Sequence, residues 1–320
     1  MQAIRLKTEH LFNPIGVDFA APRLFWNCAN GKKQTAYQII ASDDKGNLLW
    51  DSGKVASASM RAAWGGVPVA DRTKVVWKIR LWDETGATGE WAEAHFETGI
   101  GKWQAQWITG NYTVNKKRRY PVDCFRKAFS AADIRKARLY ITACGLYEAR
   151  LNGQRVGDFI LAPGITDYRK RVQYQSYDVT GLLKDGENIL SVQLADGWYR
   201  GSTGAWGIRN QYGAETKLLA QLEITHADGS VQAVCTDGSW DWSNDGPIRF
   251  ADNKEGEVVD AGKTPSYGEK AKVTSHPVTP TASNNVPVTE HERLSAALLH
   301  TPSGKTVLDF GQNIAGYVSF

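Results

Sequence analysis

The sequence has little cysteine, little methionine and no long apolar run. None of its four cysteines forms a Cys-x-x-Cys pair, so neither a zinc-ligand spacing nor a redox motif is present. We expect buried free thiols at Cys28, Cys124, Cys144 and Cys235.

No stretch approaches the ~18 consecutive apolar residues of a membrane span, and the first residues lack the apolar core of a signal peptide. We therefore expect no membrane partner. A native Met1 predicts a cytoplasmic protein, and a removed signal peptide predicts a secreted or periplasmic one.

The familiar catalytic and nucleotide-binding motifs are also absent. The sequence contains no Gly-x-Ser-x-Gly, His-Glu-x-x-His or Walker loop, and its six histidines are scattered. The net charge of +4 is too mild, and too evenly spread, to indicate nucleic acid as a partner. The longest basic run, Lys116–Arg119, is interpreted as a solvated loop rather than a phosphate-binding patch.

What the sequence does contain is typical of a β protein. There are 12 Trp, 12 Tyr and 31 Gly among 320 residues, and apolar and polar residues alternate along many short segments. Residues 217–225 predict a half-buried strand, followed by an Asp228-Gly229 hairpin turn. Asn152-Gly153 predicts a second hairpin in the same way. Strands at intervals of about ten residues indicate antiparallel sandwiches.

Helical periodicity is nearly missing. Asp178 is placed to cap one short turn over residues 179–184, and residues 290–300 predict one short helix.

Three domains are predicted from these patterns. Residues 1–100 carry seven short strands and fit a fibronectin type III-like sandwich. Residues 103–275 fit a jelly-roll (galactose-binding-like) β-sandwich. A Pro- and Thr-rich linker follows, and residues 276–320 end with a predicted hairpin in "VLDFGQNIAGYVSF", interpreted as the opening strands of a third β-domain.

Several segments, in their order, resemble bacterial α-L-rhamnosidases of glycoside hydrolase family 78. "GLYEARLNGQRVGDFILAPGITDYRKRVQYQSYDVT" and "LADGWYRG" are similar to the family's N-terminal jelly roll, and "VLDFGQNIAGYVSF" to the opening of its next sandwich. The resemblance implies the non-catalytic part of an enzyme that removes terminal α-L-rhamnose by inversion. The family's acidic catalytic residues lie on a C-terminal (α/α)6 barrel, so no catalytic residue is assigned here and the chain alone is expected to be inactive. The implied partners are rhamnose-containing glycosides and the further domains of the same polypeptide. Some relatives carry a related jelly roll that binds L-rhamnose with calcium, carbohydrate-binding module family 67.

Acidic and amide residues are the candidates for catalysis and for calcium binding. Glu255 and Glu257 share one face of an extended strand about 7 Å apart, but both come from one wall and so do not flank a substrate as a glycosidase pair must. No cofactor is required by any motif. Calcium, which takes six to eight oxygens, has scattered candidate ligands near strand ends, namely Asn152, Asp167, Asp196, Asn210 and Asp252. Of these, Asn152, Asp167 and Asn210 are retained as the candidate metal set.

The strongest candidate for ligand contact is the Gly-rich stretch "DGWYRGSTGAWGIRNQYG", a predicted long loop. Sugars stack on aromatic rings and are fixed by Arg or Asn side chains. The candidate sugar-binding residues are therefore Trp198, Tyr199, Arg200, Trp206, Arg209, Asn210 and Tyr212. The alternative is that the aromatic members plug the sandwich end, and that Trp206 packs on another domain. Trp240 and Trp242 are interpreted as core or interdomain packing.

Two function classes remain open at this point. The first is the supporting region of a rhamnosidase, which would expose apolar surface and self-associate when alone. The second is a stand-alone carbohydrate-binding or adhesion protein built from the same modules.

Overall fold

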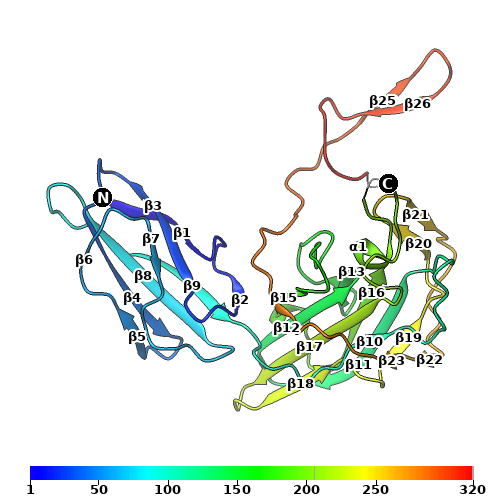
Figure 1. Ribbon diagram of the computed structural model, residues 1–320, viewed down its shortest axis with the longest axis horizontal. Helices are drawn as coiled ribbons and strands as arrows, with labels where there is room; N and C mark the ends of the chain where they lie inside the picture. The colour runs from blue at the N-terminus through cyan, green and yellow to red at the C-terminus, as the bar shows by residue number, and fades with distance from the viewer. Residues whose placement is uncertain (205, 319–320) are drawn as a thin grey trace. The chain divides into compact units, whose positions relative to one another are not determined.

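The computed structural model describes residues 1–204 and 206–318, and nearly all of its regular structure is β (Figure 1). The chain divides into two compact units, one of residues 1–157 with 161–286, and one of residues 158–160 with the chain from Pro287 onward. The all-β architecture predicted from alternation is confirmed. Within the described residues no helix is long and apolar enough to cross a membrane.

The first sandwich packs a three-stranded sheet on a six-stranded one. The smaller sheet has the order β1 (Gln2–Thr8), β3 (Arg23–Ala29), β7 (Arg61–Ala63). The larger has the order β2 (Ile15–Val17), β9 (Ala92–Thr98), β8 (Lys74–Trp82), β4 (Ala36–Asp43), β5 (Leu48–Asp51), with β6 (Val55–Ala56) also on β4. Alternation on β8 directs Val75, Trp77, Ile79 and Leu81 into the core, where all four are fully buried.

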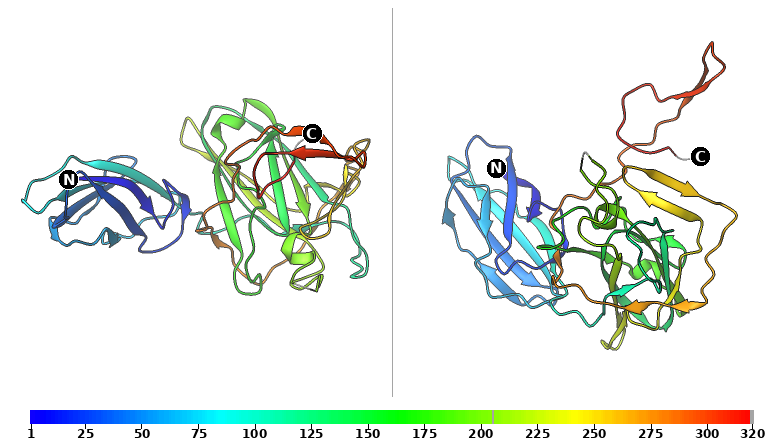
Figure 2. Two further views of the ribbon diagram at one scale, coloured as in Figure 1. Left: turned by 90° about the horizontal axis from the view of Figure 1, so that it is seen from above. Right: turned by 45° about the vertical axis from the view of Figure 1, so that its right-hand side comes forward.

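The second sandwich is larger, and its layers are visible in two further orientations (Figure 2). One sheet has the order β23 (Lys272–Val273), β10 (Ile108–Thr109), β17 (Lys217–His226), β12 (Ile134–Cys144), β15 (Gln173–Asp178), β24 (Thr281–Ala282), with β18 (Val231–Cys235) also on β17. The other has the order β14 (Gln154–Arg155), β13 (Leu146–Leu151), β16 (Gly186–Ala195), β11 (Asp123–Ala131), β19 (Asp241–Ser243), β22 (Glu269–Lys270).

The shorter elements of this sandwich lie at its ends and in its loops. They are the hairpin β20 (Ile248–Asp252) with β21 (Gly256–Val259), the helical turn α1 (Gly197–Arg200) and a 3-10 turn at Thr180–Leu182. Asp178 Oδ1 accepts from the Thr180 backbone N–H at 3.0 Å, which agrees with its predicted role at the start of that turn.

The predicted hairpin turns are confirmed by their backbone angles. Asn152 and Gly153 have φ values of 52° and 81° between β13 and β14, as a type I′ turn requires. Gly229 has a φ of 86° between β17 and β18.

The prediction of a half-buried β17 was wrong. Gln221 and Glu223, on its expected solvent face, are 0% and 8% exposed. Gln221 Oε1 accepts from the backbone N–H groups of Gln104 and Ala105. The segment after the first sandwich therefore covers this face, which alternation within β17 cannot reveal.

The helix predicted at residues 290–300 was also wrong. Residues 297–300 form strand β25 (Ala297–His300), which pairs antiparallel with β26 (Thr306–Asp309). The tight turn at Gly304, with a φ of 79°, lets the two strands pair, so that their backbone groups are satisfied between strands and not within a helix. The first strand of the predicted hairpin therefore forms where expected, but it pairs with the preceding segment. Residues 310–318 contain no strand. Phe320, the last residue of that predicted hairpin, lies outside the described residues.

Both predicted core tryptophans are buried, Trp240 at 0% and Trp242 at 5% exposure. The structure records all four cysteines as free thiols, with Cys124 and Cys144 buried and Cys28 and Cys235 half-buried. Burial raises the pKa of the Cys144 thiol to about 12, so this thiol is unreactive.

Candidate functional site

Three segments of the second sandwich contact one another and form what we call the loop cluster: residues 112–120, the described residues of 196–204 and 206–213, and residues 248–259. The central segment begins where β16 ends, and Gly197 there has a φ of 51°. A Cβ on Gly197 would lie 2.6 Å from Leu146 Cγ, so glycine is required for the sharp turn into α1. This turn places the side chains of residues 198–200 inside the domain.

Arg200 is a buried ion that is paired with a carboxylate and a hydroxyl. It is 2% exposed, its Nε donates to Asp196 Oδ1 at 2.7 Å, and its Nη1 donates to the Tyr112 hydroxyl at 2.5 Å. Burial opposes the charge of Arg200, but Asp196 and Asp123 outweigh that cost and raise its pKa. The guanidinium therefore joins the central segment of the loop cluster to the segment of residues 112–120.

Asp123, at the start of β11, is the second buried carboxyl in this region. It is 0% exposed and accepts from Trp242 Nε1 at 3.0 Å and Thr216 Oγ1 at 2.8 Å. Burial raises its pKa, because desolvation penalises the ionised form. No sequence pattern singled out Asp123, since Thr216 and Trp242 lie 93 and 119 residues away along the chain.

The predicted aromatic residues divide into a packed group and an exposed one. Tyr199 is 5% exposed and meets Tyr168 edge-on at 5.2 Å between ring centroids. Tyr212 lies 5.1 Å from Tyr168, and Trp198 is half-buried against the same cluster. These three rings fill the end of the sandwich.

Trp206 is the exposed member, at 89%. It lies on a small hairpin in which the backbones of Thr203 and Ile208 exchange two hydrogen bonds of 3.0 Å. The two polar candidates come soon after it in the sequence. Arg209 Nη2 donates to Asp196 Oδ2 at 2.7 Å, and Asn210 Nδ2 donates to the Lys116 carbonyl at 3.3 Å. Trp206, Arg209 and Asn210 therefore share one loop, whose base is hydrogen-bonded and on which Trp206 is open to solvent.

The three candidate metal ligands occupy separate local networks. Asn152 Oδ1 accepts from the Ile189 N–H, and Asn152 Nδ2 donates to Asn188 Oδ1. Asp167 binds the guanidinium of Arg169 at 2.9 Å, and this contact lowers the pKa of Asp167. In residues 1–204 and 206–318 no three His, Cys, Asp or Glu side chains are grouped so that they could hold a metal ion.

The acidic residues of the β20–β21 hairpin also have structural partners. Asp252 accepts from the backbone N–H of Ser202 at 2.6 Å, and Glu255 accepts from Arg119 and from the Ser202 hydroxyl. Glu255 is therefore committed to joining the segments of the loop cluster, whereas Glu257 lies exposed on β21.

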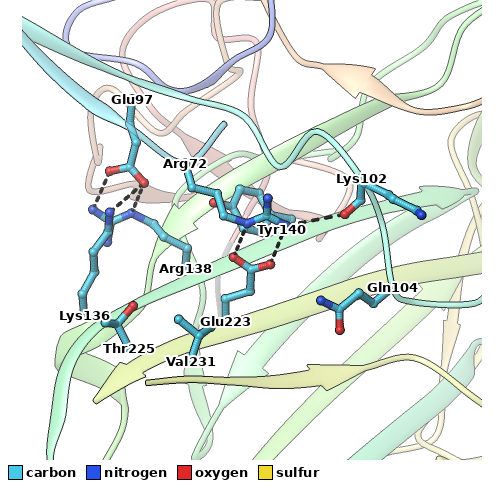
Figure 3. Close-up of a pocket in the computed structure, with 10 residues that line it drawn as sticks. All are labelled: Arg72, Glu97, Lys102, Gln104, Lys136, Arg138, Tyr140, Glu223, Thr225 and Val231. Carbon is cyan, nitrogen blue, oxygen red and sulfur yellow. Dashed lines mark hydrogen bonds and ion pairs between the residues drawn. The ribbon is translucent and has the colours of Figure 1, made fainter. Parts of the chain in front are cut away.

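A cleft of 610 Å³ lies where the first sandwich meets sheet strands β12 and β17 of the second (Figure 3). Its volume is within the range of small-ligand sites. The lining is mostly charged, and consists of Arg72, Glu97, Lys102, Gln104, Lys136, Arg138, Tyr140, Glu223, Thr225 and Val231.

The charges of this cleft are paired in a reciprocal pattern. Arg72 of the first sandwich binds Glu223 through two hydrogen bonds of 2.7 and 2.9 Å. In the opposite sense, Glu97 of the first sandwich receives two hydrogen bonds of 3.0 Å from Arg138. Lys136 Nζ lies 3.1 Å from Glu97. Each carboxylate is thus held by a bidentate arginine, which is the geometry of a joint and not of a free acid-base pair.

Burial and pairing act in opposite directions on Arg138. Burial disfavours its charge, but Glu97 and Asp178 together raise its pKa. Sequence reasoning missed all of these cleft residues, because Arg72 and Glu223 are 151 residues apart and no local pattern links them.

The fold defines a class of protein, two antiparallel β-sandwiches in tandem. Comparison with known families is more specific. Residues 132–298 match the family described as α-L-rhamnosidase N-terminal domain, and residues 3–102 match the Rha78A-like N-terminal immunoglobulin domain. The chain belongs to the α-L-rhamnosidase N-terminal domain family, as its motifs predicted.

Individual relatives agree with this assignment. An α-L-rhamnosidase of Alteromonas sp. (strain LOR) is 34% identical, over 97% of this chain and 37% of that protein. The crystal structure of the α-L-rhamnosidase of Aspergillus terreus superposes with a TM-score of 0.88 at 31% identity, over 98% of this chain and 39% of that one. For the Streptomyces avermitilis enzyme complexed with L-rhamnose the TM-score is 0.86 at 25% identity, over 98% and 49%. The chain spans less than half the length of each.

Proposed function

We propose that this chain is the N-terminal, non-catalytic region of an α-L-rhamnosidase, and that the whole protein removes terminal α-L-rhamnose from glycosides. The observation that carries the proposal is the pair of family matches, both to N-terminal domains of rhamnosidases, over residues 3–102 and 132–298. The relatives' greater length supports a division of labour in which the remainder carries the catalytic acids.

The structure of the cleft and of the loop cluster supports a non-catalytic role for this region. Glycoside hydrolysis needs two carboxyl groups that face each other across a sugar and are free to exchange protons. Glu97 and Glu223 are instead bound by arginines, and Glu255 is bound by Arg119. This region would then act by packing against its neighbours and shaping the approach to the substrate.

We further propose that the loop cluster contributes sugar contacts. Trp206 offers an indole face in water, on which the apolar face of a pyranose can stack. Arg209 and Asn210 lie next to it along the loop and carry planar hydrogen-bonding groups. Tyr199 and Arg200 are buried in the domain, so they would hold the loop in place and not touch the ligand.

Activity measurements test the division of labour. The 320-residue chain is expected to show no turnover of an aryl α-L-rhamnoside, whereas the protein encoded by the complete reading frame is expected to hydrolyse it. Robust turnover by the chain alone would refute the non-catalytic assignment. An inactive complete protein would favour a stand-alone binding or adhesion role.

Calorimetry tests the sugar contacts and the calcium question together. L-Rhamnose titrated into the chain is expected to release heat that is lost in Trp206→Ala and kept in Phe12→Ala, an exposed aromatic on the first sandwich. Repeating the titration with calcium and with a chelator shows whether a cation takes part. Absence of heat in every condition would leave the region a purely structural role.

A further inference from the structure

The Trp206 hairpin combines an exposed indole with a rigid base. Trp206 is the most exposed of the large hydrophobic side chains in the described residues. Glycines with positive φ flank the tip, Gly204 at 66° and Gly207 at 62°, so the turn depends on backbone conformations that other residues rarely adopt. An exposed indole next to a hydrogen-bonded hairpin base is typical of a recognition surface and not of a packed core.

A basic loop is attached to this hairpin by hydrogen bonds. Asn210 Nδ2 donates to the Lys116 carbonyl at 3.3 Å, and Arg209 Nη1 donates to the Arg118 carbonyl at 3.4 Å. On the other flank, Lys254 Nζ donates to the Gly204 carbonyl. These bonds keep the basic run at residues 116–119 next to the loop that carries Trp206.

The positive charge of this loop is not neutralised by the structure. Residues 116–119 are all exposed, and Arg119 is engaged by Glu255. No ion pair or side-chain hydrogen bond engages the cationic groups of Lys116, Lys117 and Arg118 within the described residues.

The acids that contact the loop carrying Trp206 already have partners, whereas Glu257 lies exposed on β21. Asp196 is buried between Arg200 and Arg209. Asp252 caps backbone N–H groups at Lys254 and Glu255. The exposed charges of residues 116–118, which lie next to the loop that carries Trp206, are positive.

We propose that this surface, Trp206 with Lys116, Lys117 and Arg118, binds a saccharide chain that carries anionic groups, either carboxylates or sulfates. The inference rests on the proposed sugar-binding role and specifies its ligand class. A sugar ring stacks on the indole, and an anionic group on a neighbouring sugar meets the three cations. A neutral glycan would leave the cations without partners.

A saccharide fits these features better than a nucleic acid. Only three free cations and one exposed ring are gathered here, and the chain's net charge is +4. Sequence-independent binding of single-stranded nucleic acid uses several stacking rings along a longer basic groove. A single platform with a short basic flank suits one or two sugars.

Binding to four defined probes tests the proposal with the 320-residue chain. The probes are an oligogalacturonide, a dextran sulfate oligomer, neutral dextran of similar length and a single-stranded oligonucleotide. We expect one of the two anionic saccharides to bind at least about tenfold more tightly than dextran in 50 mM salt, and this preference to shrink in 500 mM salt, because salt screens exposed charges. Which anionic probe binds identifies the carboxylate or the sulfate as the relevant group.

Variants assign the binding to this surface. Trp206→Ala is expected to weaken binding in low and high salt alike, and Trp206→Phe to restore part of it. The triple variant Lys116→Ser, Lys117→Ser, Arg118→Ser is expected to lose about tenfold in low salt only. Lys32→Ser with Lys33→Ser, an exposed basic pair on the first sandwich, is the matched control and should bind as the unmodified chain does. All replaced side chains are exposed, and unchanged melting temperatures would show that the variants fold.

The outcomes separate this proposal from the proposed function. Equal binding of dextran and both anionic saccharides, tighter binding of the oligonucleotide, or no binding of either anionic saccharide would each overturn it. None of these results alters turnover of a small neutral aryl rhamnoside by the complete protein, which tests the enzyme assignment independently.

Discussion

Asp123 shows how one buried residue makes stability depend on pH. Its pKa is raised by burial, so between the unfolded and folded pKa values the folded state binds more protons than the unfolded one. Stability then falls as pH rises through this window. Asp123→Asn removes that titration. The pKa values that the Asp123 charge raises, those of Arg200, Tyr112 and Cys124, lie above this pH range, so these groups stay protonated in both proteins. From pH 4 to pH 7 the unmodified chain is therefore expected to lose stability relative to the variant. The loss is about 1.4 kcal/mol for each unit by which folding raises the pKa of Asp123. Urea denaturation at both pH values measures it, and parallel pH profiles would contradict the prediction.

Gly99 is a second residue whose role follows from its immediate surroundings. A Cβ there would lie 2.1 Å from the Tyr174 hydroxyl oxygen and 3.4 Å from its ring carbon Cζ. Gly99→Ala is therefore expected to destabilise the chain by about 1–3 kcal/mol. In a Tyr174→Phe background the same change should cost clearly less, although Tyr174→Phe alone loses the hydrogen bond that the Ile100 N–H donates to Tyr174. A double-mutant cycle from chemical denaturation checks this, and additive effects would show that the hydroxyl is not the obstacle.

At the scale of elements, the sequence could predict the features that depend on residues close together along the chain. β8 alternates cleanly and is paired on both edges, so its strand and its buried face were predictable. β17 follows the same pattern, yet its polar face is covered by residues 104–105 and Arg72. Residues 290–300 have a weak helical pattern that the pairing of β25 with β26 overrides. The loop cluster was located from its Gly-rich composition, but the burial of Arg200 and the exposure of Trp206 depend on segments distant in sequence.

The hairpin β25–β26 is predicted to be the least protected β element of the described chain. All eight of its strand residues are exposed, including Leu298 at 59% and Leu299 at 48%. A hairpin without a packed face is marginal in water. Its amides are expected to exchange with solvent deuterium orders of magnitude faster than those of β12, which is paired on both edges. Hydrogen exchange followed by mass spectrometry measures this, with β20–β21 as a two-stranded comparison. Protection equal to that of β12 would indicate that another surface covers the hairpin, such as a second copy of the chain.

For the whole molecule, the reciprocal ion pairs in the cleft make the two sandwiches depend on each other. Glu223 is 9% and Arg72 36% exposed at the side chain, and removing one partner would leave a poorly solvated charge unpaired. Arg72→Glu places two carboxylates together and is expected to split a single calorimetric unfolding transition into two, with the first sandwich melting earlier. Glu223→Arg should do the same, because it places a second arginine next to Arg72.

The double swap Arg72→Glu with Glu223→Arg restores opposite charges with reversed polarity. It is expected to recover most of the cooperativity lost in either single variant, because the attraction depends on the product of the charges and not on which sandwich carries which sign. Arg169→Glu, which changes an arginine paired locally with Asp167 in the second sandwich, controls for the loss of a surface charge and should leave one transition. If the double swap melted like the single variants, the joint would depend on its tight packing at Gly99 and Tyr174 and not on its charges.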